Sequence, residues 1–533
     1  MSHILLSTVS SLTKRRQLIL WFVLIALLLL KYFWSLFLFP GVPFGYDAGI
    51  YRYLFLKHAE GWPLFMIAGM PEWARVHALG LFAFTTPFIK LGLPVDWLIG
   101  WMWNLFPVML AGVLAWVVGK RQGVTIAVAV GIAALLSTVQ YEGFLMIYQK
   151  VFVALLWCTL SFHFLDRRSR WWIVFGMLTI ATHQQIGLIF VLAILASVIG
   201  GWVAQSAKRG LFIEWIIACV LGLLWYLPTY QRSVLDLLPF VLRPVTWIAL
   251  VIVIALGVML FFGRSRIRKL DLRQVGMFVS VIMLITAVIV GWLASHVPSL
   301  AVSGEQSGAF FSIVEYCRWS LPLLVLGLGG LFLSFKKRLD DPWQWAALVS
   351  LCAVASSFFF YRRFILPLDF FLLPFAAASI TQLFFHRKTI GKILLTVLLL
   401  VQAGLLGWQM ALVDPHVEAS TLASIKLLRS VVPASSTVVV LDNMAPWVVG
   451  YLPTSAVSGP GIFDSKPLQD WQKLIYGSDQ ERRAFIASYP KGTFFLATDV
   501  FNAFYPPEAQ LLLSHSCLVE TGLPGLYTST CGQ

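Results

Sequence analysis

The chain has 533 residues, of which 59% are hydrophobic and 12% are charged, and its mean hydropathy is +0.83. Soluble globular proteins carry about 25% charged residues, so this composition excludes a soluble globular protein and predicts a polytopic α-helical membrane protein. The net charge of +15 comes largely from short basic clusters between apolar runs. That distribution is typical of cytoplasmic loops and argues against binding of nucleic acid.

The first apolar run, residues 18–39, is too long for the apolar core of a signal peptide, and no small-residue cleavage site follows it. We interpret it as a retained first span with the N-terminus in the cytoplasm. The apolar runs and basic turns predict about 13 spans, near residues 17–39, 97–119, 122–138, 148–165, 171–184, 186–204, 211–228, 245–263, 274–292, 316–335, 343–360, 365–384 and 390–411. The runs 171–184 and 186–204 can instead form a re-entrant pair. The C-terminus lies outside whether these runs are two spans or one re-entrant pair.

Residues 40–96 are predicted to form the first outer loop. Within it, the stretch 44–81 is rich in charged residues and histidines, and polar groups at that density beside a bilayer need either water or a function. Asp47 is a favourable N-cap and predicts a helix that reaches His58. The segment 74–91 is apolar enough to lie in the membrane interface as a second helix.

Residues 412–533 have a different composition and predict a small extracytoplasmic α/β domain. Its expected elements are a helix at 417–431, a strand at 435–442, helices at 469–477 and 479–490, and a strand at 492–499. Cys517 and Cys531 both lie in this domain, where an outer location permits a disulfide without requiring one. Residues 1–411 form the predicted transmembrane domain.

Several cationic side chains lie on the predicted outer side, where the positive-inside rule does not place them. Arg362 and Arg363 occupy a short outer turn, Arg318 the outer start of a span, and Arg232 an outer loop. Guanidinium groups match the geometry of phosphate, so these arginines are candidates for an anionic ligand. Contact with lipid headgroups is the alternative.

Three further polar residues stand beside apolar runs. His183 lies in a polar break between two runs, and a satisfied buried histidine is the alternative reading. Glu142 lies in another predicted outer turn, residues 139–147, and Lys150 follows it. His58 and His77 are read as interfacial polar residues.

Four segments carry a resemblance to the GT-C superfamily of membrane glycosyltransferases, prokaryotic type. They are the run Gly45-Tyr46-Asp47-Ala48-Gly49-Ile50-Tyr51, the run Gly61-Trp62-Pro63, the stretch 139–155 and the turn Thr182-His183-Gln184. The resemblance implies transfer of a sugar from a polyprenyl-phosphate-linked donor to an extracytoplasmic lipid, glycan or protein acceptor at the cell membrane. It leaves open whether Mg²⁺ or Mn²⁺ takes part, and the sequence itself shows no cluster of Cys and His with metal-ligand spacing.

The resemblance makes Asp47 the candidate base for the acceptor hydroxyl, while capping of its helix alone is the alternative. Many members of the superfamily carry two adjacent acidic residues here, whereas Ala48 follows Asp47 in this chain. Glu72 is therefore the candidate second acid or a metal ligand, and a solvated loop residue is the alternative. The candidates for the donor phosphate are Arg318, Arg362, Arg363, His183 and Arg232.

Two other functions are compatible with the sequence. A GT-C-shaped protein without catalysis would bind a lipid-linked glycan, and the missing adjacent acid favours it. A transporter of lipids or solutes would be expected to show inverted repeats with matching broken helices, and the sequence shows no such symmetry.

Overall fold

The computed structural model describes residues 14–62, 70–203, 210–227, 281–285, 287–289, 310–335, 339–357, 360–386, 389–464 and 466–532. These residues divide into two compact units. The membrane unit comprises the described residues of 1–34, 78–81 and 103–413, and the loop–sheet unit those of 35–77, 82–102 and 414–533. The two units are described in turn.

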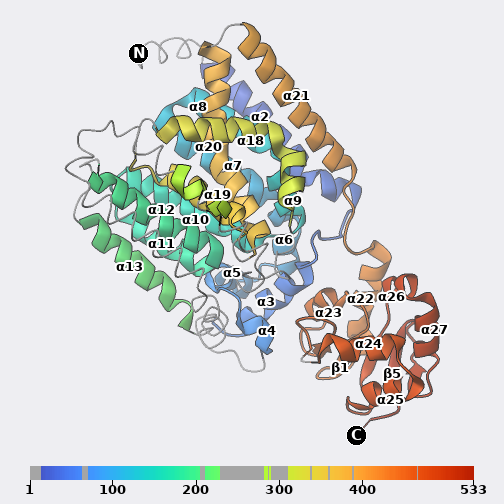
Figure 1. Ribbon diagram of the computed structural model, residues 1–533. Helices are drawn as coiled ribbons and strands as arrows, with labels where there is room; N and C mark the ends of the chain where they lie inside the picture. Colours follow the sequence, from blue (N-terminus) through green and yellow to red (C-terminus); the bar gives the residue numbers. More distant parts are fainter. Residues whose placement is uncertain are drawn as a thin grey trace. The chain divides into compact units, whose positions relative to one another are not determined.

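The membrane unit is helical throughout its described part (Figure 1). Its elements are α2 (Lys14–Leu38), which continues into the other unit, α7 (Trp101–Gln122), α8 (Val124–Leu136), α9 (Thr138–Leu145), α10 (Gln149–Asp166), α11 (Trp171–Thr182), α12 (Gln184–Val203), α13 (Gly210–Leu224), α18 (Ile313–Phe335), α19 (Pro342–Ala355), the short 3₁₀ helix η2 (Tyr361–Phe364), α20 (Ile365–His386) and α21 (Thr389–Ala411).

Six helices in the described residues are long and apolar enough to cross a membrane, or seven if α8 and α9, which are bent by 54°, form one span. The prediction of a polytopic helical membrane protein is therefore confirmed. The predicted number of spans stays unconfirmed, because the segment 245–263 and most of 274–292 lie outside the described residues.

Helix α20 lies at the centre of the membrane unit, with 83% of the span 361–385 buried, whereas only 17% of α21 is buried. Small residues let α18 approach α20 closely. A Cβ atom added at Gly330 would lie 2.1 Å from the Phe375 carbonyl oxygen. Arg121 joins α7 to α10 and α19. It donates to both carboxylate oxygens of Asp341, the N-cap residue of α19, at 2.9 and 2.8 Å, and it lies 3.5 Å from Asp166 at the end of α10.

The loop part of the loop–sheet unit contains α3 (Ala48–Glu60), α4 (Glu72–Arg75), α5 (Gly80–Lys90), whose first residues belong to the membrane unit, and α6 (Val95–Ile99). The predicted helix after Asp47 is confirmed, with Gly61 as its C-cap. The prediction of one helix over 74–91 is wrong. Helix α4 ends at Arg75, whose guanidinium folds back to the Met70 carbonyl at 2.8 Å, and the chain becomes helical again only at Gly80.

The C-terminal part is the small α/β domain that the sequence predicts. Its helices are α22 (Ala419–Val431), α23 (Ala445–Tyr451), α24 (Leu468–Tyr476), α25 (Asp479–Ala487), α26 (Asp499–Phe504) and α27 (Pro506–Leu513). Its strands are β1 (Thr437–Val440), β2 (Ala456–Ser458), β3 (Phe494–Leu496), β4 (Leu518–Glu520) and β5 (Leu526–Ser529), in the order β2-β1-β3-β5-β4. Strand β1 pairs in parallel with β2 and β3, and β5 pairs antiparallel with β3 and β4.

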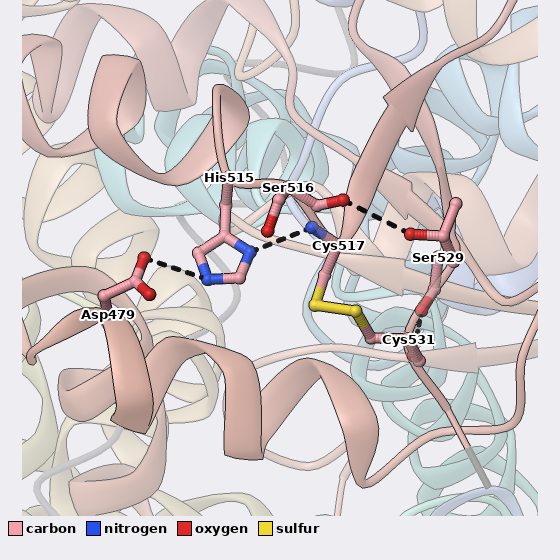
Figure 2. The surroundings of a disulfide bond; sticks show 7 residues. Asp479, His515, Ser516, Cys517, Ser529 and Cys531 are labelled. Carbon is pink, nitrogen blue, oxygen red and sulfur yellow. Dashed lines mark hydrogen bonds and ion pairs between the residues drawn. A yellow bond between two sulfur atoms is a disulfide. The ribbon is translucent and has the colours of Figure 1, made fainter.

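A disulfide joins Cys517, just before β4, to Cys531, just after β5 (Figure 2). His515 lies beside it, accepting a hydrogen bond from the Cys517 N–H at 3.1 Å through Nδ1 and placing Nε2 3.1 Å from Asp479. The bond closes the edge of the sheet, and it requires an oxidising compartment to persist.

Candidate active site

The structure holds two groups of candidate residues, one in each unit. The first surrounds Asp47. Asp47 occupies the N-cap position of α3, but its side chain makes no capping hydrogen bond. Capping alone therefore does not account for this carboxylate.

Helix α3 is held against α23 by direct backbone contact. A Cβ atom added at Gly49 would lie 2.0 Å from the Pro446 carbonyl oxygen, and one added at Gly450 would lie 2.5 Å from the Gly49 carbonyl oxygen. Arg52, one turn further along α3, donates to the Gly450 carbonyl at 2.5 Å and to Asp96 at 2.8 Å. These contacts fix the start of α3, and with it Asp47, relative to the C-terminal domain.

Asp442 is a second carboxylate that lies, like Asp47, within electrostatic range of Tyr46. Burial raises the pKa of Tyr46 to about 12, and the charges of Asp47 and Asp442 both add to that shift. Asp442 is 7% exposed and accepts hydrogen bonds from Thr498 at 3.1 and 2.7 Å and from the Met444 N–H at 2.8 Å. Burial raises the pKa of Asp442, while these hydrogen bonds oppose the rise.

The position of Asp442 follows from the topology of the sheet. It comes directly after β1, and Thr498 comes shortly after β3, so both lie at the carboxyl ends of two adjacent parallel strands. Strand β1 has β2 on one side and β3 on the other, which makes this edge a topological switch point, the usual place for a ligand in an open α/β sheet. Sequence reasoning missed Asp442, although an acidic residue that ends a buried strand was a usable signal.

Glu72, the predicted second acid, begins α4, and its side chain is exposed. Two other carboxylates share electrostatic neighbours with Asp47. Asp442 and Asp47 both act on Tyr46, and Asp414 and Asp47 both act on His416. The role of Glu72 stays a prediction.

The second group lies in the membrane unit around η2. Arg362 and Arg363 are half-buried there, and within the described part of the chain no hydrogen-bond acceptor contacts the buried Nε atom of either one. The Arg363 guanidinium lies 4.9 Å from the ring centroid of Phe360, which adopts the left-handed conformation with φ of 53°. Residues in such sparsely populated conformations concentrate at functional sites.

Charged residues from three helices share the surroundings of η2. Glu315 at the start of α18 lies within electrostatic range of Arg362, and Glu142 of α9 within range of Glu315. Glu142 also accepts a hydrogen bond from Gln409 at 2.9 Å. The charges of Arg363 and Lys150 both act on the His183 ring.

His183 thus lies within electrostatic range of Arg363 and Lys150, and its Nδ1 atom accepts a hydrogen bond from the Ile186 N–H at 3.4 Å. Arg318 is exposed on α18, and Arg232 lies outside the described residues. Glu315 was not singled out from the sequence, although its place beside a predicted outer loop was visible there.

The described residues contain no group of three or more His, Cys, Asp or Glu side chains that could hold a metal ion.

No protein-family model matches the sequence, and comparison with curated proteins finds no match. Solved structures do match. The oligosaccharyltransferase of Archaeoglobus fulgidus in its apo form superimposes with a TM-score of 0.53 at 13% identity, covering 94% of this chain and 69% of that one. A second structure of that protein, in complex with Zn and sulfate, superimposes with a TM-score of 0.53 at 12% identity. That match covers 88% of this chain and 67% of the oligosaccharyltransferase. These matches show that the chain has a fold like that of this oligosaccharyltransferase, and such a fold is consistent with the resemblance found in the sequence.

Proposed function

We propose that this protein is a membrane glycosyltransferase that moves a sugar from a polyprenyl-phosphate-linked donor to an extracytoplasmic lipid, glycan or protein acceptor. The observation that carries the proposal is Asp47, a carboxylate at the start of a rigidly held helix whose side chain does not cap that helix. The GT-C-like fold supports the same reaction class.

In this proposal, the oxygen of the acceptor hydroxyl bonds to the anomeric carbon of the donor sugar, and Asp47 accepts the proton of that hydroxyl. The bond from that carbon to the phosphate oxygen breaks, and the lipid phosphate leaves with the electron pair. Arg362 and Arg363 hold the phosphate and stabilise its increasing negative charge. Their buried Nε atoms have no acceptor among the described residues, so a phosphate oxygen would supply one.

The base is tested by Asp47→Asn in purified, folded protein. General-base catalysis contributes about 10²- to 10⁴-fold, so sugar transfer should fall by at least about 100-fold. Glu60→Gln is the matched control, because Glu60 is an exposed carboxylate on the same helix that pairs with Lys57 at 3.0 Å. Full activity of Asp47→Asn would show that Asp47 is not the base.

The phosphate site is tested by the double variant Arg362→Ala/Arg363→Ala. Its KM for the lipid-linked donor should rise, while the exposed Arg170→Ala should leave that KM unchanged. Equal KM values for all three proteins would exclude the two arginines as phosphate ligands.

The proposed orientation places the N-terminus in the cytoplasm and the C-terminal domain outside the cell membrane. The Cys517–Cys531 disulfide supports it, because such bonds persist in oxidising compartments. Labelling of cysteines introduced at exposed positions of α22, with a membrane-impermeant reagent on intact cells, tests the orientation directly.

A second function, binding of a lipid-linked glycan without transfer, is favoured by one observation. Ala48 stands where many GT-C enzymes carry a second acid, and the described residues offer no metal site in compensation. Donor binding that persists in Asp47→Asn, with no transfer product from the wild-type protein, would support this function instead.

A further inference from the structure

Asp369 is an acidic residue buried within the central span α20, where its side chain is 3% exposed. A charged group inside a membrane is costly and usually has a function. Its Oδ2 atom accepts hydrogen bonds from the Ser137 hydroxyl at 2.7 Å and from the Gln140 side chain at 2.9 Å. Its Oδ1 atom lies 3.5 Å from the Ser320 hydroxyl, which donates to it.

Lys31 supplies the opposite charge from α2, and its side chain is 2% exposed. Its ammonium donates to the carbonyl oxygens of Ala134 at 3.1 Å and Ser137 at 2.7 Å, and it lies within electrostatic range of Asp369. Ser137 therefore links the two charges, because its carbonyl binds Lys31 and its hydroxyl binds Asp369.

This network lies at the break between α8 and α9. A 54° bend leaves carbonyl groups at the end of α8 and N–H groups at the start of α9 without helical partners. Lys31 binds two of those carbonyls, and the Ser137 hydroxyl accepts the Gln140 N–H at 3.0 Å. The buried charges thus stabilise the bend itself, which an apolar core could not do.

Each element that contacts Asp369 also carries a residue of the group around η2. Gln140 lies two residues before Glu142 on α9, and Ser320 lies five residues after Glu315 on α18. Asp369 itself follows η2, the carrier of Arg362 and Arg363, by about one helical turn. A second bond, from the Thr138 hydroxyl to the Trp319 carbonyl at 3.0 Å, joins α9 to α18 at the same level.

We propose that Asp369 is a positioning residue which, with Lys31, sets the geometry of the phosphate-binding group at η2 by fixing α9, α18 and α20 to one another. The inference rests on the proposed function of that group. It assigns Asp369 no contact with the substrate.

The test uses the full chain in lipid nanodiscs and a prenyl phosphate, farnesyl phosphate, as the probe of phosphate binding. Asp369→Asn keeps one acceptor oxygen and should bind the probe about 3-fold more weakly than wild type, whereas Asp369→Leu loses every acceptor and should bind about 30-fold more weakly. Ser379→Ala is the matched control, because Ser379 also joins α20 to α18, through the Leu326 carbonyl at 2.8 Å, but lies almost three turns from Asp369. The control should bind like wild type.

Unfolding temperatures are measured on the same samples, so that a loss of affinity can be separated from a loss of fold. The inference is overturned if Asp369→Leu folds and binds the probe like wild type. It is also overturned if Ser379→Ala loses as much affinity for the probe as Asp369→Leu does. If Asp369→Leu does not fold, Asp369→Asn and Ser137→Ala decide the matter by the same comparison with Ser379→Ala.

The variant Arg362→Ala/Arg363→Ala separates this inference from the proposed function. If it loses the probe while Asp369→Leu retains it, the positioning role alone is wrong. If it binds the probe like wild type, the proposed phosphate site is wrong, and the positioning role fails with it.

Discussion

Gly49→Ala tests whether the contact between α3 and α23 sets the position of the proposed base. The added methyl group would lie 2.0 Å from the Pro446 carbonyl oxygen and 2.6 Å from the Trp447 Cα atom. Ordinary van der Waals contact begins at 3.4 Å, so the two backbones must separate by 3.4 − 2.0 = 1.4 Å at this point. Both obstructing atoms belong to the backbone, and no side-chain rotation can relieve the clash.

Asp47 lies two residues before the substituted position and should move with the start of α3. A misplacement of about 1 Å can cost about 100-fold in rate, so we expect a loss of that order in sugar transfer. Overpacking of this kind should also cost about 1–3 kcal/mol in stability. Gly450→Ala addresses the same contact from the other helix and should produce the same loss.

The assay measures transfer of labelled sugar from a lipid-linked donor in membranes that contain equal amounts of each variant, together with the unfolding temperature of the purified proteins. Gly404→Ala on α21 is the control, because a Cβ atom there meets no atom within 4 Å. If Gly49→Ala and Gly404→Ala are equally active and equally stable, the contact does not position Asp47, and the reasoning is refuted.

Three further predictions concern stability. Reduction of the Cys517–Cys531 bond, which closes a loop with a sequence separation of 14, should destabilise the C-terminal domain by about 3 kcal/mol, and an unchanged unfolding midpoint with reductant would contradict this. Burial alone would raise the pKa of Asp464, but hydrogen bonds from Ser458, Tyr489 and the Lys466 N–H outweigh it and lower that pKa. The stability that Asp464 contributes is therefore present above the unfolded pKa of about 3.9 and is lost as the pH falls through the folded value. Hydrogen exchange of the Lys466 amide, which donates to Asp464 at 2.9 Å, should therefore accelerate below about pH 4 more in wild type than in Asp464→Asn. Arg121→Lys should lower the unfolding temperature, because a lysine cannot bind both oxygens of Asp341 at once, whereas the exposed Arg168→Lys should have no effect.

The elements that depend on local pattern were predictable from the sequence. Long apolar runs indicated the helices of the membrane unit. The residue type at position 47 indicated the start of α3, because aspartate is frequent at N-cap positions, although its side chain makes no capping hydrogen bond here. Strands β2 and β4, with three residues each, and β5, with four, were missed, because segments this short show no alternating pattern. Strand β3 is equally short but lies within the predicted strand 492–499.

The surroundings of the candidate sites were not predictable in the same way. Asp442 comes within electrostatic range of Tyr46 because α23 packs on α3, which joins segments that are far apart in the sequence. Lys31 and Asp369 carried a usable signal, because each is an isolated charge in an apolar run. The sequence did not show that Ser137, at the break between α8 and α9, is the common partner of these two residues.

The two candidate groups are held by different physical means, and this difference decides which substitutions disturb each of them. Steric contact between backbones holds Asp47, where Gly49 and Gly450 leave no room for a methyl group. In the proposed arrangement, buried charges hold η2, because Asp369 and Lys31 lie within electrostatic range of each other and share Ser137 as a hydrogen-bond partner. Added volume is therefore the sensitive perturbation for Asp47, and removed charge is the sensitive one for Arg362 and Arg363.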